Sequence, residues 1–191
     1  MKIKNKKIVY IDMDNVLTDF KSGIDLLSNE NKIKYKKRYD EAPDIFRKME
    51  PMRHAVYSFE FLYKYFDVYI LTTSPWENNK ALGDKLFWIK KHLGKKSKKR
   101  VIFSHYKNLL NGDYIIDDKT KNGVSKFKGE HIYFGKDPYF GWLEVLDYMI
   151  TKIDDINVRN RAKAEKEQLE AFERSIDWEF INLRMDHLSE K

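Results

Sequence analysis

The sequence of 191 residues contains no cysteine. This absence excludes disulfide bonds, catalysis by a thiolate nucleophile and metal sites built from thiolates. A long hydrophobic run is missing too: the apolar stretch after the basic N-terminus is broken by Asp12 and Asp14, and no later stretch is long enough to cross a bilayer. Internal repeats and low-complexity linkers are also lacking. We therefore expect a cytoplasmic protein with neither a signal peptide nor a membrane span.

What the chain does contain is enough apolar material for a folded core, with 42% hydrophobic and 15% aromatic residues. Its net charge is +7, with basic clusters at 32–38 and 95–100. Such clusters can attract nucleic acid. They are more often solvated helix faces and loops, and a positive field would equally attract a small anionic substrate. The charge alone therefore does not favour nucleic acid as a partner.

Short apolar runs that stop at polar residues predict strands at 7–11, 67–72, 100–103, 114–116 and 131–134. Between them, helices are expected over 53–66 and 80–93. In the second of these helices the apolar residues that recur at helical spacing are Leu82, Leu86, Ile89 and Leu93. Strands that alternate with helices predict a parallel sheet with right-handed crossovers. The fold class is therefore α/β, a doubly wound, Rossmann-like parallel sheet.

Two segments do not fit the alternating pattern. The stretch 21–52 is longer than a connection from strand to helix needs, and it leaves the carboxyl end of the first strand, so we expect a small helical cap inserted there. The tail 151–191 is highly charged but carries one apolar stripe, Leu169, Phe172, Ile176, Phe180 and Leu183. We expect a core over 1–150 and a helical extension over 151–191 that packs on the cap or joins two chains in a homodimer.

Polar side chains follow four of the five predicted strands. Asp12 and Asp14 end the first strand, and side chains at i and i+2 share a face of a strand. The other ends carry Thr73-Ser74, Lys107 and Asp117-Asp118. Singly these are ordinary turns, caps and solvated lysines. Because the carboxyl ends of parallel strands meet at one edge, we expect them to form a single site.

This set of side chains suits the handling of a phosphate group. Several carboxylates without cysteine ligands match a hard cation, and Mg²⁺ binds in this way while sharing oxygens of a substrate phosphate. Hydroxyl and backbone N–H groups at Thr73 and Ser74 can hold phosphate oxygens, and Lys107 can offset the charge of the transition state. The sequence therefore predicts a Mg²⁺-dependent phosphate chemistry.

The ordered motifs resemble those of the haloacid dehalogenase (HAD) superfamily of phosphatases. More narrowly, Asp-Met-Asp-Asn-Val-Leu-Thr-Asp-Phe, Leu-Thr-Thr-Ser-Pro, Tyr-Lys and Ile-Ile-Asp-Asp are similar to the 5'(3')-deoxyribonucleotidases of the cytosolic and mitochondrial pyrimidine type, in their bacterial and phage form. The resemblance implies a phosphatase that acts on nucleoside 5'-monophosphates, pyrimidine deoxynucleotides in particular. Asn15 stands where the vertebrate pattern has Gly, and Asn tolerates the same left-handed turn.

The resemblance also implies a role for each motif residue. Asp12 would be the nucleophile that forms an aspartyl-phosphate, and Asp14 the acid and then the base, with its backbone carbonyl on Mg²⁺. Asp12 with one or both of the paired aspartates would complete the metal shell, and hydroxyl and ammonium groups would bind phosphate. The implied metal residues are Asp12, Asp14, Asp117 and Asp118, and the implied phosphate ligands are Thr73, Ser74 and Lys107.

A pocket for the nucleobase is implied by the aromatic residue just after the first motif. Phe20 matches the family aromatic that stacks on the base, and Phe46 and Trp76 are further candidates for the same pocket. Lys85 could reach the phosphate, but we interpret it as an exposed lysine of the helix over 80–93.

Two other functions remain open from the sequence. One is a HAD phosphatase that acts on another small phosphoester or on a polynucleotide end. In the second case the basic clusters would bind the polynucleotide. The other is a non-catalytic protein that binds nucleic acid or a protein partner. The non-catalytic function is disfavoured because buried carboxylates destabilise the folded state, and a protein that catalyses no reaction would have no reason to retain them.

Overall fold

The computed structural model describes residues 6–175. Its centre is a sheet of five parallel strands in the order β5-β4-β1-β6-β7. The strands are β1 (Ile8–Ile11), β4 (Asp67–Thr72), β5 (Val101–Phe103), β6 (Tyr114–Asp117) and β7 (Glu130–Tyr133). β1 lies in the middle, with Val9 aligned to Val68 on one side and to Tyr114 on the other. This arrangement confirms the predicted α/β fold, and the nearly continuous burial of β1 and β6 explains the apolar runs 8–11 and 114–116.

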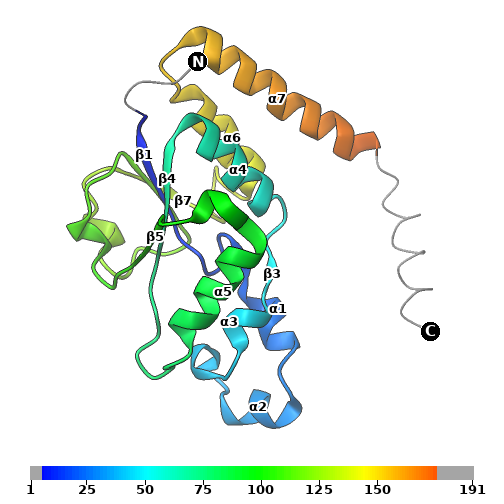
Figure 1. The fold of residues 1–191 in the computed structure, drawn as a ribbon, viewed down its shortest axis with the longest axis vertical. Helices are drawn as coiled ribbons and strands as arrows, with labels where there is room; N and C mark the ends of the chain where they lie inside the picture. The colour runs from blue at the N-terminus through cyan, green and yellow to red at the C-terminus, as the bar shows by residue number, and fades with distance from the viewer. Residues whose placement is uncertain (1–5, 176–191) are drawn as a thin grey trace. The chain divides into compact units, whose positions relative to one another are not determined.

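Helices α4 (Ala55–Tyr65) and α5 (Ala81–Leu93) form the crossovers from β1 to β4 and from β4 to β5. Both crossovers move in the same direction along the sheet, so right-handed connections put the two helices on the same face (Figure 1). The chain then returns to place β6 on the other side of β1. The order of strands therefore reverses at β1, and in open α/β sheets such a point is where ligands bind.

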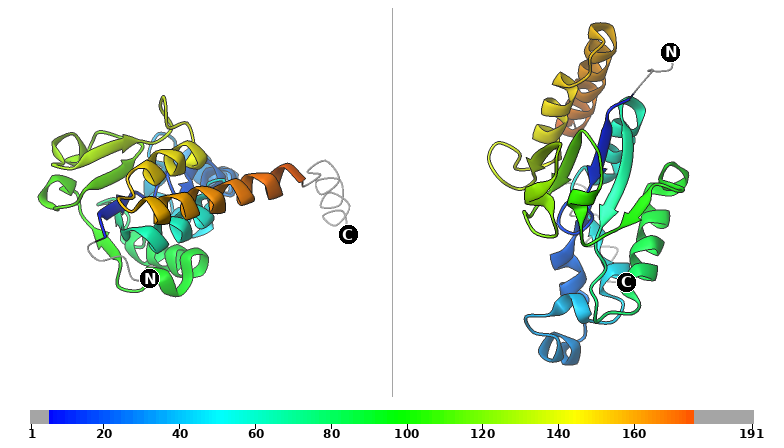
Figure 2. Two further views of the ribbon diagram at one scale, coloured as in Figure 1. Left: turned by 90° about the horizontal axis from the view of Figure 1, so that it is seen from above. Right: turned by 90° about the vertical axis from the view of Figure 1, so that its left-hand side faces the viewer.

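The insertion after β1 is helical, as predicted. It contains α1 (Phe20–Asp25), α2 (Asn29–Lys34), the 3-10 turn η1 (Tyr39–Glu41) and α3 (Ile45–Lys48). The small antiparallel pair β2 (Thr18–Asp19) and β3 (Glu50–Pro51) flanks it at both ends. Trp88 of α5 donates its indole N–H to the carbonyl of Met49 at 2.7 Å, which ties the cap to the core. Figure 2 shows the cap beyond the end of the sheet at which β1 leaves it.

The remaining turns and helices complete the chain: η2 (Gly94–Ser97), η3 (Lys107–Leu109), η4 (Val124–Lys126), α6 (Trp142–Thr151) and α7 (Ile156–Ser175). The structure divides into two compact units, Met1–Val145 and Leu146–Lys191. No helix of the described part is long and apolar enough to cross a membrane.

The second unit contains most of α6 and all of α7. Within it, Lys166 of α7 forms ion pairs with Asp147 of α6 at 2.9 Å and with Glu170 at 2.5 Å. Leu169, from the predicted apolar stripe, is half-buried, and Phe172 is 63% exposed. The other stripe residues, Ile176, Phe180 and Leu183, lie outside the described residues. The predicted boundary at 150/151 and the role of the tail stay predictions.

Candidate active site

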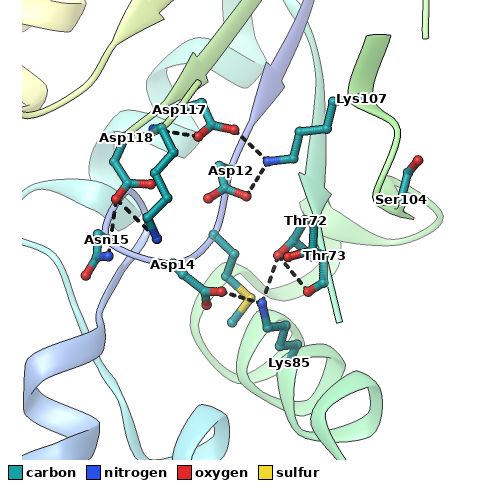
Figure 3. Close-up of polar contacts among 12 residues, drawn as sticks. Asp12, Asp14, Asn15, Thr72, Thr73, Lys85, Ser104, Lys107, Asp117 and Asp118 are labelled. Carbon is teal, nitrogen blue, oxygen red and sulfur yellow. Dashed lines mark hydrogen bonds and ion pairs between the residues drawn. The ribbon is translucent and has the colours of Figure 1, made fainter. Parts of the chain in front are cut away.

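A tight turn at the end of β1 sets the positions of Asp12 and Asp14. The backbone N–H of Asp12 continues the ladder by donating to the carbonyl of Ile116 at 2.9 Å. The chain then reverses, with the N–H of Asn15 donating to the carbonyl of Thr18 at 2.8 Å. Asn15 has a φ of 60°, the left-handed conformation that asparagine adopts more readily than most residues. The turn keeps both carboxylates at the carboxyl edge of the sheet (Figure 3).

Three carboxylates meet at this edge. One oxygen from each of Asp12, Asp117 and Asp118 lies within 4.8 Å of the others, and Asp12 and Asp117 are buried. Burial and the neighbouring charge of Asp12 raise the pKa of Asp117 to about 6, against the opposing effect of Lys107. Burial also raises the pKa of Asp118, against the charge of Lys119. The cluster is therefore short of positive charge, and a further cation would stabilise its ionised form.

Lys107 provides part of that charge. It is the first residue of η3, only 2% exposed, and its ammonium donates to Asp12 at 2.7 Å and to Asp117 at 2.6 Å. Burial alone would lower the pKa of Lys107, but the two carboxylates outweigh burial and the pKa is raised. Lys107 is thus held as a cation between two of the predicted site residues.

Lys85 is a second ammonium in the site, and the interpretation of Lys85 as an exposed helix lysine is wrong. Its side chain is 0% exposed. The ammonium donates to Oδ2 of Asp14 at 2.6 Å and to Oγ1 of Thr72 at 3.0 Å, and it lies 4.5 Å from the centre of the Phe46 ring. Burial raises the pKa of Asp14, and the charge of Lys85 opposes that rise. Figure 3 shows the lysine reaching up from α5 toward both residues.

The error has a physical reason. Apolar spacing predicted that α5 buries Leu82 and Leu86, but Leu82 is 48% exposed and Leu86 is only half-buried. Ile89 and Leu93 of the same spacing are buried as predicted, but the buried face of the helix also includes Ala81, Asp84, Lys85 and Trp88. This face lies under α3 of the cap, and two of its residues are charged. Hydrophobic spacing cannot reveal a buried face whose polar groups belong to a site, because the insertion that covers Lys85 lies more than 30 residues earlier in the sequence.

The predicted phosphate ligands Thr73 and Ser74 follow β4. Thr73 lines a cavity of about 420 Å³ next to Asp14, and Ser74 is half-buried beside it. Residues from both the cap and the sheet edge line this cavity, including Phe20, Lys37, Tyr39, Lys119 and Asn122. Its volume lies within the usual range of about 300–1,000 Å³ for small-ligand sites.

Only one of the three aromatic candidates for the base pocket lines the cavity. Phe20 does so. Phe46 is buried behind it, with the two ring centres 6.0 Å apart, and packs against Lys85. Trp76 is 86% exposed and is not part of the cavity wall. The assignment of Phe46 and Trp76 to a base pocket stays a prediction.

The oxygen atoms that lack partners test whether a metal ion would fit. Among the described residues, one buried oxygen of Asp118 and one of Asp14 have no hydrogen-bond partner. Both oxygens of Asp117 are engaged, one by Lys107 and the other by the backbone N–H of Lys119 at 2.9 Å. The donor set is made of oxygens only, which is the preference of Mg²⁺. The residues therefore fit a hard divalent cation, with Asp118 better placed than Asp117 to ligate it directly.

Comparisons with known proteins identify the family of the chain. The family model described as 5' nucleotidase, deoxy (pyrimidine), cytosolic type C matches residues 25–144. A 5'(3')-deoxyribonucleotidase of Vibrio phage KVP40 is 53% identical over 148 residues, which are 78% of this chain and 87% of the relative. The human cytosolic-type 5'(3')-deoxyribonucleotidase is 27% identical over 157 residues, with 66% and 78% of the two chains covered.

Among solved structures, the HAD-hydrolase YfnB of Bacillus subtilis, described as bound to magnesium, superposes with a TM-score of 0.50 at 13% identity. The match covers 71% of this chain and 89% of that one, and at this identity it speaks for the fold alone. The fold, the family model and the phage relative together confirm the resemblance that the motifs suggested. The chain belongs to the 5' nucleotidase family of the deoxy (pyrimidine), cytosolic type C, a family of hydrolases with a HAD-like fold.

Proposed function

We propose that this chain is a Mg²⁺-dependent phosphatase that hydrolyses nucleoside 5'-monophosphates, with pyrimidine deoxynucleotides as preferred substrates, through an aspartyl-phosphate on Asp12. The observation that carries the proposal is that two buried ammonium groups contact the carboxylates of the site: Lys107 binds Asp12, and Lys85 binds Asp14, which lines the cavity. The names of the phage and human relatives support the class of substrate. The human relative is a cytosolic type, which supports the cytoplasm as the place of action.

The reaction needs two displacements at phosphorus. A carboxylate oxygen of Asp12 attacks the phosphorus, and the bond to the nucleoside oxygen breaks as Asp14 gives its proton to that oxygen. In the second step Asp14 takes a proton from water, the water oxygen attacks the phosphorus, and the bond to Asp12 breaks. Burial raises the pKa of Asp14, which is the direction that a general acid requires, and this supports its role as the acid.

Asp12, Asp118 and the backbone carbonyl of Asp14 would hold Mg²⁺. When bound, the ion offsets the negative charge of the phosphoryl group and allows a carboxylate to approach it. Asp117, with both oxygens engaged, would hold Lys107 in place. The phosphate oxygens would be bound by Thr73, Ser74, Lys107 and Lys85, the last of which we add because its buried ammonium already points to Asp14.

A phosphate-release screen tests the proposal. Purified protein is given deoxy- and ribonucleoside monophosphates with each base, and sugar phosphates, with Mg²⁺ or with EDTA. We expect release from pyrimidine deoxynucleotides with Mg²⁺ only. Hydrolysis of sugar phosphates but not nucleotides would favour the alternative of another small phosphoester, and no release from any substrate would contradict the phosphatase itself.

Substitution of Asp117 and of Asp118 tests which of the two aspartates binds Mg²⁺ directly. Asp118→Asn should raise the Mg²⁺ concentration needed for half-maximal activity more than Asp117→Asn does, because only Asp118 has an oxygen without a partner. Each substitution removes one charge, so the two variants serve as controls for each other. Equal shifts, or a larger shift for Asp117→Asn, would contradict the assignment of Asp118 as the direct ligand.

A further inference from the structure

Asn78 is a buried polar residue that no catalytic step uses. It lies in the loop between β4 and α5, after Thr73 and Ser74, and is 7% exposed. Its side-chain N–H groups donate to two carbonyls of the cap, that of Asp40 at 2.9 Å and that of Ala42 at 3.2 Å. Its side-chain oxygen accepts from the backbone N–H of Lys80 at 3.2 Å, at the start of α5. One amide group therefore joins the cap to the loop that carries the predicted phosphate ligands.

The segment of the cap that Asn78 holds is a wall of the cavity. Lys37, Tyr39 and Asp40 all line it, and the N–H of Ala42 closes the turn by donating to the carbonyl of Tyr39 at 3.0 Å. Lys37 has a φ of 71°, in the left-handed region that a lysine rarely adopts. A strained residue of this kind persists only where the surrounding structure holds it, and such residues gather at binding sites. The strained backbone at Lys37 and the hydrogen bonds from Asn78, which we call the tether, are two separate observations on the same cavity wall.

The chemistry of the side chain shows what the tether is for. Accepting the hydrogen bond from the backbone N–H of Lys80 needs only a side-chain oxygen, and aspartate would serve equally well. Holding two carbonyls of the cap needs two N–H donors on one short side chain, which asparagine supplies and aspartate does not. The amide is thus required by the cap contacts and not by the helix.

We propose that Asn78 is a positioning residue that keeps the cavity wall of Lys37, Tyr39 and Asp40 in register with the phosphate-binding loop. A nucleotide reaches both places at once, with its phosphate at the sheet edge and its nucleoside against the cap. A small shift of one relative to the other lowers the fraction of bound substrate in a reactive geometry. A substrate that is little more than a phosphate ester does not reach the wall and is insensitive to the tether. The inference rests on the proposed nucleotidase function.

The test compares Asn78→Asp with Asn79→Asp. Asn79 is the exposed neighbour, so the two variants add the same charge one residue apart, and only the first loses the donors to the cap. Steady-state kinetics are measured with thymidine 5'-monophosphate and with p-nitrophenyl phosphate. We expect Asn78→Asp to raise the KM for the nucleotide about tenfold while kcat/KM for p-nitrophenyl phosphate stays within about twofold of wild type. Asn79→Asp should behave as wild type with both substrates.

Equal losses on both substrates would overturn the proposal, because a merely structural role lowers the amount of active protein without regard to substrate. Unchanged nucleotide kinetics in Asn78→Asp would overturn it as well. If wild-type protein hydrolyses neither compound, the proposed function fails instead, so the two failures are distinguishable.

A second variant covers the case in which Asn78→Asp does not fold. Lys37→Gly relieves the left-handed backbone and removes a side chain from the cavity wall. We expect an unfolding temperature equal to or above that of wild type together with a raised KM for thymidine 5'-monophosphate and unchanged kinetics with p-nitrophenyl phosphate. A raised KM for both substrates, or for neither, would show that this wall does not contact the nucleoside.

Discussion

Lys107 and Lys166 form the same kind of ion-pair cluster in two different surroundings. Each is a buried lysine whose ammonium pairs with two carboxylates at 2.5–2.9 Å. In the site, the carboxylates of Asp12 and Asp117 are buried with the lysine, at 11% and 3% exposure. In the second unit, Asp147 is 66% and Glu170 is 26% exposed. The difference lies in the acids and not in the lysine.

This difference separates a structural ion pair from a reactive one. Water solvates the acids around Lys166. The ion pair between Lys166 and Asp147 therefore joins α6 to α7 with a small desolvation penalty and a small contribution to stability. Around Lys107 the acids lack that solvation, and burial raises the pKa of Asp117 to about 6 although an ammonium lies 2.6 Å away. Removing one partner from such a buried set is costly. A deficit of positive charge, more than the ion pairs themselves, supports the proposal that this site binds a cation and a phosphate.

The largest expected effect comes from the carboxylate that we propose as the nucleophile. Asp12→Asn keeps the shape and the contact with Lys107 but cannot attack phosphorus, so kcat should fall by about 10⁵ or more, on the order of 7 kcal/mol. Phosphate release from thymidine 5'-monophosphate measures it, with circular dichroism to confirm the fold. Activity close to that of wild type would rule out an aspartyl-phosphate on Asp12.

Lys107→Met should have the next largest effect. It leaves Asp12 and Asp117 buried without their shared ammonium, and we expect kcat/KM to fall by about 10²–10³, the usual result of removing one group that stabilises the transition state. Stability should fall too, by about 3–5 kcal/mol, as when a buried ion pair loses one partner. Urea denaturation and phosphate release check the two effects. A variant that keeps its activity would show that Lys107 has a structural role alone.

Mg²⁺ should stabilise the protein more at pH 7.5 than at pH 5. The folded-state pKa of Asp117 is raised above its ordinary value, so its ionisation disfavours the folded state as pH rises through about 6, and the penalty persists above that pH. A cation that binds the ionised cluster relieves the penalty, whereas near pH 5 it must compete with protons. Thermal unfolding with MgCl₂ or EDTA at each pH measures the shift, and Asp12→Asn provides a control with less negative charge. An equal shift at both pH values would contradict the assignment of the metal to this cluster.

Lys166→Met should have the smallest effect and completes the comparison. Methionine matches most of the buried stem of the lysine, and the acids that lose their partner are partly solvated, so stability should change by about 1 kcal/mol or less. Phosphate release should stay within about twofold of wild type. A loss of activity as large as that of Lys107→Met would show that the second unit contributes to the site.

Much of the sheet and of the candidate site could be predicted from the sequence, because buried parallel strands appear as short apolar runs that end at polar residues. The predicted strand 67–72 is β4 residue for residue, and the carboxyl ends of β1, β4 and β6 place the expected aspartates and Thr73 at one edge of the sheet. Lys85 was misread because its helix is covered by an insertion, and the polar residues of the covered face look exposed by hydrophobic spacing. Asn78 carried no signal, since a loop asparagine is ordinary until its donors are seen on the carbonyls of a cap 36 and 38 residues earlier.

The central place of β1 has a consequence for the growing chain. The strand that precedes Asp12 is the first to be synthesised, but its neighbours come much later, Asp67 opposite Ile8 and Tyr114 opposite Val9. The turn after Asp12 is completed even later in synthesis, because the indole N–H of Trp142 donates to the carbonyl of Val16 at 2.8 Å. A chain interrupted before β6 leaves one edge of β1, an entirely apolar strand, open to other molecules. We therefore expect unfinished copies to be prone to aggregation, and the proposed site to be complete only when synthesis of the core is nearly finished.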